Sequence, residues 1–297
     1  MEYNFNTMKY QIFKSTVLVL FFLMGCKFDK SVSKDFNTSI STEGNGLSVD
    51  EVIVSTDAER LDDNVFIYGQ KLTTDFENMQ GFTVENGLYY AKMGFEITNA
   101  DGEVIMKEDN LLDTAMGQDA SLKTLSGELI LAQPMHSGQK YMVKYHITDE
   151  KGGGTFSSKM DFEILPNPAI QVQESGLKAL EVYVFNKDTQ RVITNAETNF
   201  DNIMQFQFDN IEGYTVVDGF VAIDLSIKVA DAKGEQILYD KNAFENMPLT
   251  EADLEEGIGG VLVFSEGIIN NPVTWEVEMW DMNSEARLKG VTQLNVN

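Results

Sequence analysis

Cysteine and histidine are scarce in this chain. Its 297 residues include one cysteine, Cys26, and two histidines, His136 and His146. One cysteine excludes disulfides within the chain and zinc sites built from several thiolates. The sequence also has no His-x-His or His-Glu-x-x-His spacing, no Gly-x-Ser-x-Gly elbow and no phosphate-binding loop. It therefore gives no support for zinc or serine-hydrolase chemistry, and we expect no enzymatic activity.

Basic residues are also few. Lysine and arginine number 22 against 47 aspartates and glutamates, a formal net charge of −25. Such an acidic chain repels nucleic acid and anionic lipid, so we expect no nucleic-acid partner. Paired carboxylates, as used in glycoside hydrolysis, occur somewhere in any chain this acidic, but no spacing singles out a pair.

The first residues have the pattern of a secretion signal. Lys9 and Lys14 precede an apolar run at residues 17–24, which is too short to span a bilayer as a helix. The run ends in Leu23-Met24-Gly25-Cys26, a tetrapeptide that resembles the bacterial lipobox. The resemblance implies cleavage between Gly25 and Cys26 and acylation of Cys26, which would anchor the protein to a membrane through lipid.

The residues around the expected cleavage site indicate where the anchored protein is placed. By resemblance to enterobacterial lipoproteins, in which aspartate at the next position retains the protein in the inner membrane, Lys27 favours the outer membrane. Residues 26–46 are polar and small without a sustained period, and are predicted to form a flexible tether. The sequence leaves open which face of the outer membrane is occupied, and whether translation starts at Met1 or Met8.

An internal repeat organises the rest of the chain. Residues 76–112 recur without a gap at residues 208–244, an offset of 132, and about eleven of the thirty-seven positions are identical. We therefore predict a signal peptide at residues 1–25, the tether at 26–46, one domain at 47–165, a linker at 166–170 with prolines at the seam, and a second domain at 171–297. The glycines at positions 81, 87, 213 and 219 recur in both copies and indicate turns with positive φ.

Alternating polarity predicts the fold class. In residues 141–149 and 273–281 every second side chain is apolar, as in antiparallel strands with one wet face, and this places Trp275 in the core. About seven or eight short strands are expected in each copy, with one short helix at residues 119–125 and another after the capping box Thr250-Glu-Ala-Asp253. The predicted fold is all-β: two tandem immunoglobulin-like antiparallel β-sandwiches.

Two groups of residues are candidates for ligand binding. Asp57, Glu59, Asp62 and Asp63 form a dense acidic loop whose oxygen ligands suit calcium, with a solvated loop as the alternative. Trp280 has the opposite parity to Trp275 and lies at a strand end, where it either stacks on a sugar or covers the rim of the sandwich. Apart from this calcium hypothesis we expect no cofactor.

The lipobox, tether and tandem sandwiches together resemble envelope lipoproteins of Bacteroidota, including the accessory glycan-binding lipoproteins of starch-utilisation systems. The signal segment carries the specific part of this resemblance, and the body matches in architecture only. We expect a non-enzymatic, membrane-anchored lipoprotein that acts in protein interaction or envelope assembly. The alternative is a cell-surface glycan-binding lipoprotein.

Overall fold

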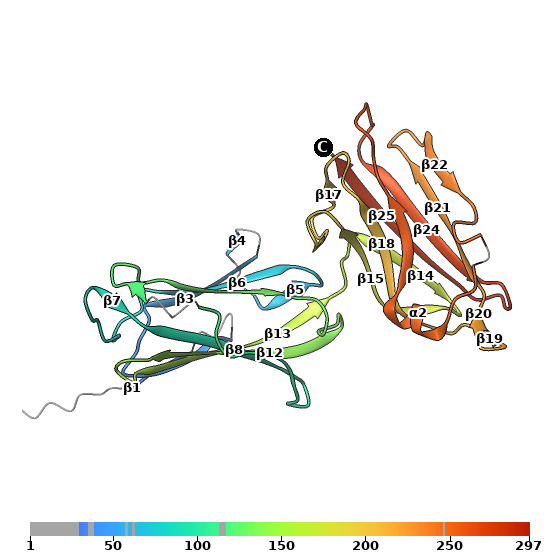
Figure 1. The fold of residues 1–297 in the computed structure, drawn as a ribbon. Helices are drawn as coiled ribbons and strands as arrows, with labels where there is room; N and C mark the ends of the chain where they lie inside the picture. The colour runs from blue at the N-terminus through green and yellow to red at the C-terminus, as the bar shows by residue number, and fades with distance from the viewer. Residues whose placement is uncertain (1–29, 35–38, 57–58, 61–62, 113–116, 246) are drawn as a thin grey trace, which may run out of the picture.

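Two antiparallel β-sandwiches follow one another along the chain in the computed structural model (Figure 1). The structure describes residues 30–34, 39–56, 59–60, 63–112, 117–245 and 247–297. The predicted fold class, all-β with immunoglobulin-like sandwiches, is confirmed. Within the described residues, no helix has the length and apolar character needed to cross a membrane.

The first sandwich is built from the strands before the prolines at the seam. They are β1 (Lys30–Lys34), β2 (Ser41–Asn45), β3 (Glu51–Thr56), β4 (Glu59–Arg60), β5 (Val65–Ile67), β6 (Lys71–Glu77), β7 (Leu88–Tyr89), β8 (Ala91–Asn99), β9 (Val104–Glu108), β10 (Gln118–Asp119), β11 (Leu125–Ile130), β12 (Gln139–Asp149) and β13 (Thr155–Leu165). Its two main sheets have the orders β1-β2-β13-β12-β8-β9 and β11-β6-β3-β4, and β5 pairs in parallel with β13.

The second sandwich repeats this arrangement. Its elements are β14 (Ile170–Ser175), β15 (Lys178–Asn186), β16 (Arg191–Val192), β17 (Glu197–Thr198), β18 (Met204–Glu212), β19 (Val216–Val217), β20 (Phe220–Val221), β21 (Ile223–Ala230), β22 (Gln236–Asp240), α2 (Glu251–Glu256), β23 (Ile258–Leu262), β24 (Val273–Asp281) and β25 (Arg287–Val296). The sheet orders are β14-β25-β24-β21-β22 and β16-β15-β18-β23, and β17 pairs in parallel with β25. Each of these strands except β19 has its counterpart strand in the first sandwich.

Alternation along the strands separates core from surface. In β24 the side chains alternate between buried and half-buried from end to end. Trp275 is fully buried, as predicted, and meets the ring of Phe206 edge-on with centroids 5.4 Å apart. Phe76 and Tyr145 make a similar contact at 5.3 Å in the first sandwich. Edge-to-face pairs of this kind fix the two sheets of each sandwich relative to one another.

The repeated glycines do have positive φ, as predicted. Gly81 and Gly213 have φ of 94° and 88°, and Gly87 and Gly219 have φ of 82° and 83°. The first pair also faces a steric limit, because a Cβ on Gly213 would overlap the carbonyl oxygen of Gly176, and one on Gly81 would overlap that of Gly46. Backbone proximity and backbone conformation together therefore require glycine at these two positions.

The predicted flexible tether is wrong for ten of its residues. Lys30–Lys34 and Ser41–Asn45 form β1 and β2, and β2 pairs with β13 at the edge of the larger sheet. Ile40, just before β2, is only 5% exposed and belongs to the core. β2 is not recognisable in the sequence because its residues are small and polar. It is stabilised by backbone pairing and by the one buried apolar residue beside it, Ile40.

The predicted helix of the first copy is also wrong, whereas that of the second is confirmed. Thr250 caps α2 and forms the reciprocal box with Asp253. The corresponding positions in the first copy are Gln118 and Ser121, which cannot form that box. There the Asp119 carboxylate instead accepts hydrogen bonds from the Ser121 amide at 2.8 Å and hydroxyl at 2.7 Å. These bonds close a turn in place of a helix.

We predict that Gly213→Ala destabilises the second sandwich by more than about 3 kcal/mol, whereas Gly219→Ala costs about 1 kcal/mol. Both substitutions put a side chain at positive φ, but only the first also drives a Cβ into a carbonyl oxygen, since nothing lies within 4 Å of the Cβ position at Gly219. Urea unfolding followed by the fluorescence of Trp275 and Trp280 measures both. Equal losses for the two variants would contradict the proposed role of the close approach.

Candidate functional site

A buried carboxylate recurs at the end of each last hairpin. Asp149 and Asp281 stand 132 residues apart and are only 3% and 1% exposed. Asp149 accepts a hydrogen bond from the Thr83 amide at 2.8 Å, and Asp281 accepts one from the Thr215 amide at 2.9 Å. Each thereby joins its hairpin to the glycine-bounded loop of its own copy, and we call this arrangement the carboxylate clamp.

Hydrogen bonding keeps the clamp carboxylates charged. Asp281 also accepts hydrogen bonds from the Asn283 amide at 2.9 Å and the Ser284 hydroxyl at 2.8 Å. Burial alone would raise the pKa of Asp281 and of Asp149, but the hydrogen bonds to the charged form outweigh it, so the pKa of each lies below the usual aspartate range. The clamps are therefore structural, and neither carboxylate is free to transfer protons at neutral pH.

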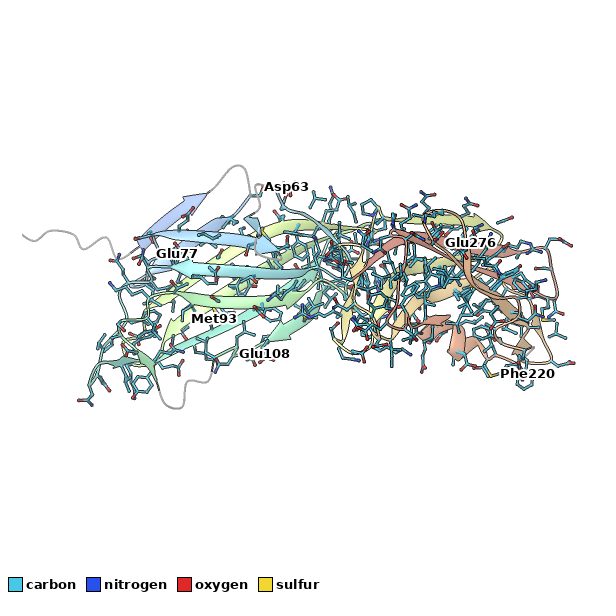
Figure 2. The ribbon with its side chains drawn as sticks, turned by 90° about the horizontal axis from the view of Figure 1, so that it is seen from above. Asp63, Glu77, Met93, Glu108, Phe220 and Glu276 are labelled. Carbon is cyan, nitrogen blue, oxygen red and sulfur yellow. The ribbon has the colours of Figure 1, made fainter. Side chains whose placement is uncertain are left out.

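In the second sandwich the clamp supports an exposed apolar surface. The members of this tip surface are 43 to 52% exposed: Val216, Val217, Phe220, Met247 and Met282. A pocket of 300 Å³ opens among them, lined also by Pro248 and Asn283. Phe220 lies at the end of the second sandwich that is remote from the first (Figure 2).

Backbone hydrogen bonds hold the tip surface in place. The Met282 amide, next to the clamp residue Asp281, donates to the Ala222 carbonyl at 2.8 Å. Val221 and Leu249 exchange both of their backbone hydrogen bonds, at 2.8 and 3.1 Å. The apolar side chains are thus presented by a fixed framework, so a partner would bind without ordering these segments.

The corresponding end of the first sandwich is more polar. Positions 217 and 282 of the second copy are valine and methionine, whereas their counterparts in the first copy are Glu85 and Glu150. Val84, which is 54% exposed and corresponds to Val216, and Leu88, which is half-buried and corresponds to Phe220, keep their apolar character there. The same framework therefore carries charge on one copy and an apolar surface on the other.

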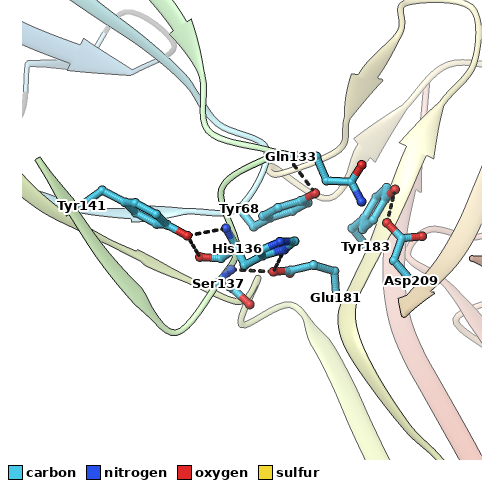
Figure 3. A network of polar contacts seen from close by, with 8 residues as sticks. All are labelled: Tyr68, Gln133, His136, Ser137, Tyr141, Glu181, Tyr183 and Asp209. Atoms are coloured by element: carbon cyan, nitrogen blue, oxygen red, sulfur yellow. Dashed lines mark hydrogen bonds and ion pairs between the residues drawn. The ribbon is translucent and has the colours of Figure 1, made fainter. Parts of the chain in front are cut away.

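A second concentration of unusual groups lies where the end of the first sandwich meets the outer face of β15 and β18 (Figure 3). The junction cluster consists of Tyr68, Gln133, His136, Ser137 and Tyr141 from the first sandwich and Glu181, Tyr183 and Asp209 from the second. The Ser137 amide donates to Glu181 Oε1 at 2.5 Å, and His136 Nδ1 lies 3.6 Å from the same oxygen. The rings of Tyr68 and Tyr183 pack with centroids 5.4 Å apart.

Burial perturbs the acids of this cluster. Glu181 and Asp209 are each 2% exposed. Burial raises the pKa of Glu181 to about 7, although the hydrogen bonds from Ser137 act in the opposite direction. Burial likewise raises the pKa of Asp209, whose carboxylate accepts hydrogen bonds from Tyr183 at 2.9 Å and Gln207 at 2.7 Å. Among the described residues, these are the carboxyls whose pKa is raised, and both are enclosed in the contact between the sandwiches.

One glycine permits the close contact of the two sandwiches. Gly69, with φ of 90°, follows Tyr68 and faces Val192 of β16. A Cβ at Gly69 would overlap the side chain of Val192, so any other residue would push the second sandwich away. Asn167, between the two prolines of the linker, is also buried, and its amide donates to the Ile193 carbonyl at 3.3 Å. The contact between the sandwiches is therefore closely packed both at Gly69 and at the linker.

The structure separates the candidates that the sequence suggested. Cys26, Asp57 and Asp62 lie outside the described residues, and so does the side chain of Glu59. Asp63 is exposed and accepts a hydrogen bond from the Val65 amide at 3.4 Å. The described residues contain no group of three or more histidines, aspartates and glutamates placed to hold a metal ion. Calcium binding by the acidic loop stays a prediction.

Trp280 lies on the outer face of its sheet. It is half-buried on β24, opposite Asp224 of β21 and Arg287 of β25. Its parity is that predicted, but its ring is partly covered by its surroundings. Stacking of Trp280 on a glycan stays a prediction.

Sequence reasoning did not identify the junction cluster. The counterparts of Glu181, Tyr183 and Asp209 in the first copy are Val49, Glu51 and Glu77, so the repeat gives no signal for the cluster. One signal was present: Gln205, Gln207 and Asp209 alternate with two phenylalanines on β18. That pattern indicates a wet face, whereas Gln207 and Asp209 are buried.

Comparisons with known proteins do not assign this chain to a family. No protein-family model matches the chain, and no curated protein matches it either. Among solved structures it is similar to pT26-6p, with 6% identity over 91% of this chain and 66% of that one and a TM-score of 0.26. It is also similar to a calcium-binding mutant of Bacteroides uniformis β-glucuronidase 2, with 8% identity over 86% of this chain and 32% of that one and a TM-score of 0.23.

A third similar structure is a DUF3823 family protein from Bacteroides ovatus, with 11% identity over 73% of this chain and 93% of that one and a TM-score of 0.22. The chain thus spans 66% and 32% of the first two structures' lengths. At TM-scores this low, the strand pairing described above carries the fold assignment.

We predict that raising the pH from 5 to 8 weakens the contact between the sandwiches. A glutamate uncovered by separation titrates near 4.5, below the value of about 7 for Glu181 in the contact. The contact is thus fully stable below pH 4.5 and loses stability as the pH rises through 7. Glu181→Gln, which keeps an acceptor for Ser137, should remove this dependence and strengthen the contact at pH 8 by about 2 kcal/mol.

The distribution of distances between spin labels at Lys159 and Lys187, one exposed position in each sandwich, measures this effect. In the wild type the distribution should broaden from pH 5 to pH 8, and in Glu181→Gln it should not. The same broadening in both proteins would assign the pH response to a group other than Glu181.

Proposed function

We propose that the protein is a non-enzymatic lipoprotein, anchored in the outer membrane through Cys26, that presents the tip surface of its second sandwich to a protein partner in the envelope. The observation that carries this proposal is the exposed apolar side chains held on a rigid framework. Contiguous exposed apolar side chains on a soluble domain mark sites of interaction.

The position of the tip surface agrees with an anchored protein. β1, the described strand nearest in sequence to Cys26, lies at the end of the first sandwich remote from the second, whereas β19 and β20 lie at the far end of the second (Figure 1). The tip surface is therefore presented away from the anchored end. Its side chains are valine, phenylalanine and methionine, which suit apolar protein side chains better than sugar hydroxyls.

The two carboxyls with a raised pKa also fit this proposal better than an enzyme. Catalytic acids need access to a substrate, whereas Glu181 and Asp209 are covered by the contact between the sandwiches. The glycan-binding alternative depends on Trp280, which is half-buried, and so receives less support from the structure.

A photo-reactive benzoylphenylalanine at Phe220 is predicted to give a discrete covalent adduct with one envelope protein in intact cells. The same residue at Val84, the exposed valine of the first sandwich's corresponding end, is the control. Introducing the first copy's charges through Val217→Glu and Met282→Glu should reduce the adduct at least about tenfold, since charge is costly to bury in an apolar interface.

Circular dichroism and the melting temperature establish that the glutamate variants remain folded. If Phe220 and Val84 give the same adducts, or if the glutamates leave the adduct unchanged, the tip surface is not the interaction site.

With residues 1–25 replaced by a secretory signal whose cleavage needs no lipidation, Cys26→Ser is predicted to move the protein from the membrane fraction to the soluble periplasmic fraction, because the anchor is the lipid and the acidic surface has no affinity for anionic membranes. Mass spectrometry of the N-terminal peptide should show acyl chains on residue 26 in the wild type only. A protein that stays in the membrane fraction after Cys26→Ser would contradict lipid anchoring.

A further inference from the structure

The first described strand begins close to the expected lipid anchor. β1 starts at Lys30, only four residues after Cys26. An extended chain spans at most about 3.6 Å per residue, so four residues reach no further than about 14 Å. With the acyl chains of the proposed function on Cys26, on which this step rests, the start of β1 stays within that distance of the membrane surface.

The strand pairing places the start of β1 at one end of the first sandwich. Lys30 pairs with Asn45 of β2, and Asn45 pairs with Thr155, the first residue of β13. Just after β2, Ser48 and Gln80 exchange backbone hydrogen bonds at 3.1 and 2.9 Å. β1 and β7 lie at this same end, remote from the second sandwich (Figure 1). We call the end formed by residues 79–90, 118–123 and 149–155 the proximal end.

Apolar side chains are exposed at the proximal end. Leu122 is 62% exposed and Val84 is 54% exposed. Both border a pocket of 320 Å³ that is also lined by Phe82 and Tyr89, whose rings stack with centroids 4.6 Å apart. The Tyr89 hydroxyl donates to the Leu122 carbonyl at 2.9 Å. The leucine is therefore held in place beside the pocket.

The exposure of Leu122 is peculiar to the first copy. Its counterpart Leu254 lies in α2 and is fully buried, whereas Leu122 follows the turn that Asp119 and Ser121 close. A large apolar side chain left in water forgoes the free energy that its burial would give. An apolar phase in front of the proximal end would recover it.

The proximal end is also far less acidic than the chain as a whole. Its exposed charged residues are Glu85, Asp119, Lys123, Glu150 and Lys151, a net charge of −1, against −25 for the whole chain. Lys123 lines the pocket, and the Lys151 ammonium group lies 4.8 Å from the centroid of the Tyr90 ring. Lysine stems lie along apolar surface while their ammonium groups reach lipid phosphates. The charge at this end therefore permits contact with a bilayer that the rest of the surface would oppose.

We infer that the proximal end lies against the membrane in which Cys26 is anchored, held there by the short tether, with Leu122 and Val84 inserted at the boundary between headgroups and acyl chains. Two side chains are too few to bind a membrane alone, but a tethered contact forms at high local concentration. The contact therefore agrees with the soluble behaviour expected of Cys26→Ser. It goes beyond the proposed function by assigning a lipid-facing surface to the first sandwich.

The sole cysteine allows a test that does not need acylation in the cell. The mature chain, residues 26–297, is coupled through the Cys26 thiol to maleimide-bearing phosphatidylethanolamine in phosphatidylcholine vesicles. Native tryptophans occur only in the second sandwich, as Trp275 and Trp280. A tryptophan introduced at the proximal end therefore reports on membrane contact through quenching by phosphatidylcholine that is brominated on its acyl chains.

Val84→Trp should lose at least about half of its added fluorescence in brominated vesicles, because side chains at the interface reach the upper acyl chains. Leu122→Trp is a second probe and should behave in the same way. Val216→Trp, the repeat counterpart of Val84 in the tip surface, is the matched control. It should be quenched no more than the native tryptophans.

Two changes should weaken the contact measured by Val84→Trp. Leu122→Glu should reduce the quenching at least about twofold, since a carboxylate is costly to place among acyl chains. Val104→Glu adds the same charge at a 53% exposed position of the same sandwich, in the hairpin beside Tyr141 of the junction cluster, and should leave the quenching unchanged. Inserting about twenty glycine and serine residues after Cys26 should also reduce it, because a longer tether lowers the local concentration.

The outcomes separate this contact from lipid anchoring itself. Equal quenching of Val84→Trp and Val216→Trp, no quenching of either proximal probe, or quenching that survives both Leu122→Glu and the longer tether would each overturn the contact. Melting temperatures establish that the variants remain folded. Acylation of Cys26 is tested independently by Cys26→Ser, so the failure of the contact would leave the anchor standing.

Discussion

A buried, ionised aspartate holds each half of this protein together. The clamp joins the last hairpin to the glycine-bounded loop, which are 66 residues apart in each copy. A charge so little exposed is tolerated only because amide and hydroxyl donors surround it, and those donors lie on the two segments that the clamp must join. Replacing either segment would leave the carboxylate unpaired, so hairpin, loop and aspartate form one unit.

The two copies share this framework and differ in what they place on it. At the end of the framework the first copy has Glu85 and Glu150, where the second has Val217 and Met282. On the outer face of the smaller sheet, the second copy has the acids that meet the first sandwich. The two copies thus share the same interior arrangement, and the differences between them lie on their surfaces.

The sequence predicts those parts of the structure that depend on nearby residues or on the repeat. Alternation along β24 placed Trp275 in the core, the spacing of Thr250 and Asp253 identified the cap of α2, and the recurrence of Gly213 indicated positive φ. Each of these signals is either local in the sequence or present in both copies.

The strand β2 escaped prediction because its order comes from pairing with β13, more than a hundred residues away. The junction cluster escaped because its members occur in one copy only and come from distant segments. The sequence correctly predicted the sheet face on which Trp280 lies. It does not identify a ligand for Trp280, because a half-buried ring can either bind a ligand or pack against its neighbours.

The glycine at position 69 has a mechanical consequence. Because the absence of its side chain lets Val192 approach, the contact between the sandwiches sets the direction in which the second one points. The tip surface lies at the opposite end of the second sandwich from that contact. A rotation of the second sandwich about the contact therefore moves the tip surface further than it moves the residues of the contact. A small rotation there becomes a large displacement of Phe220, and a few atoms around Gly69 determine where the far end of the molecule is directed.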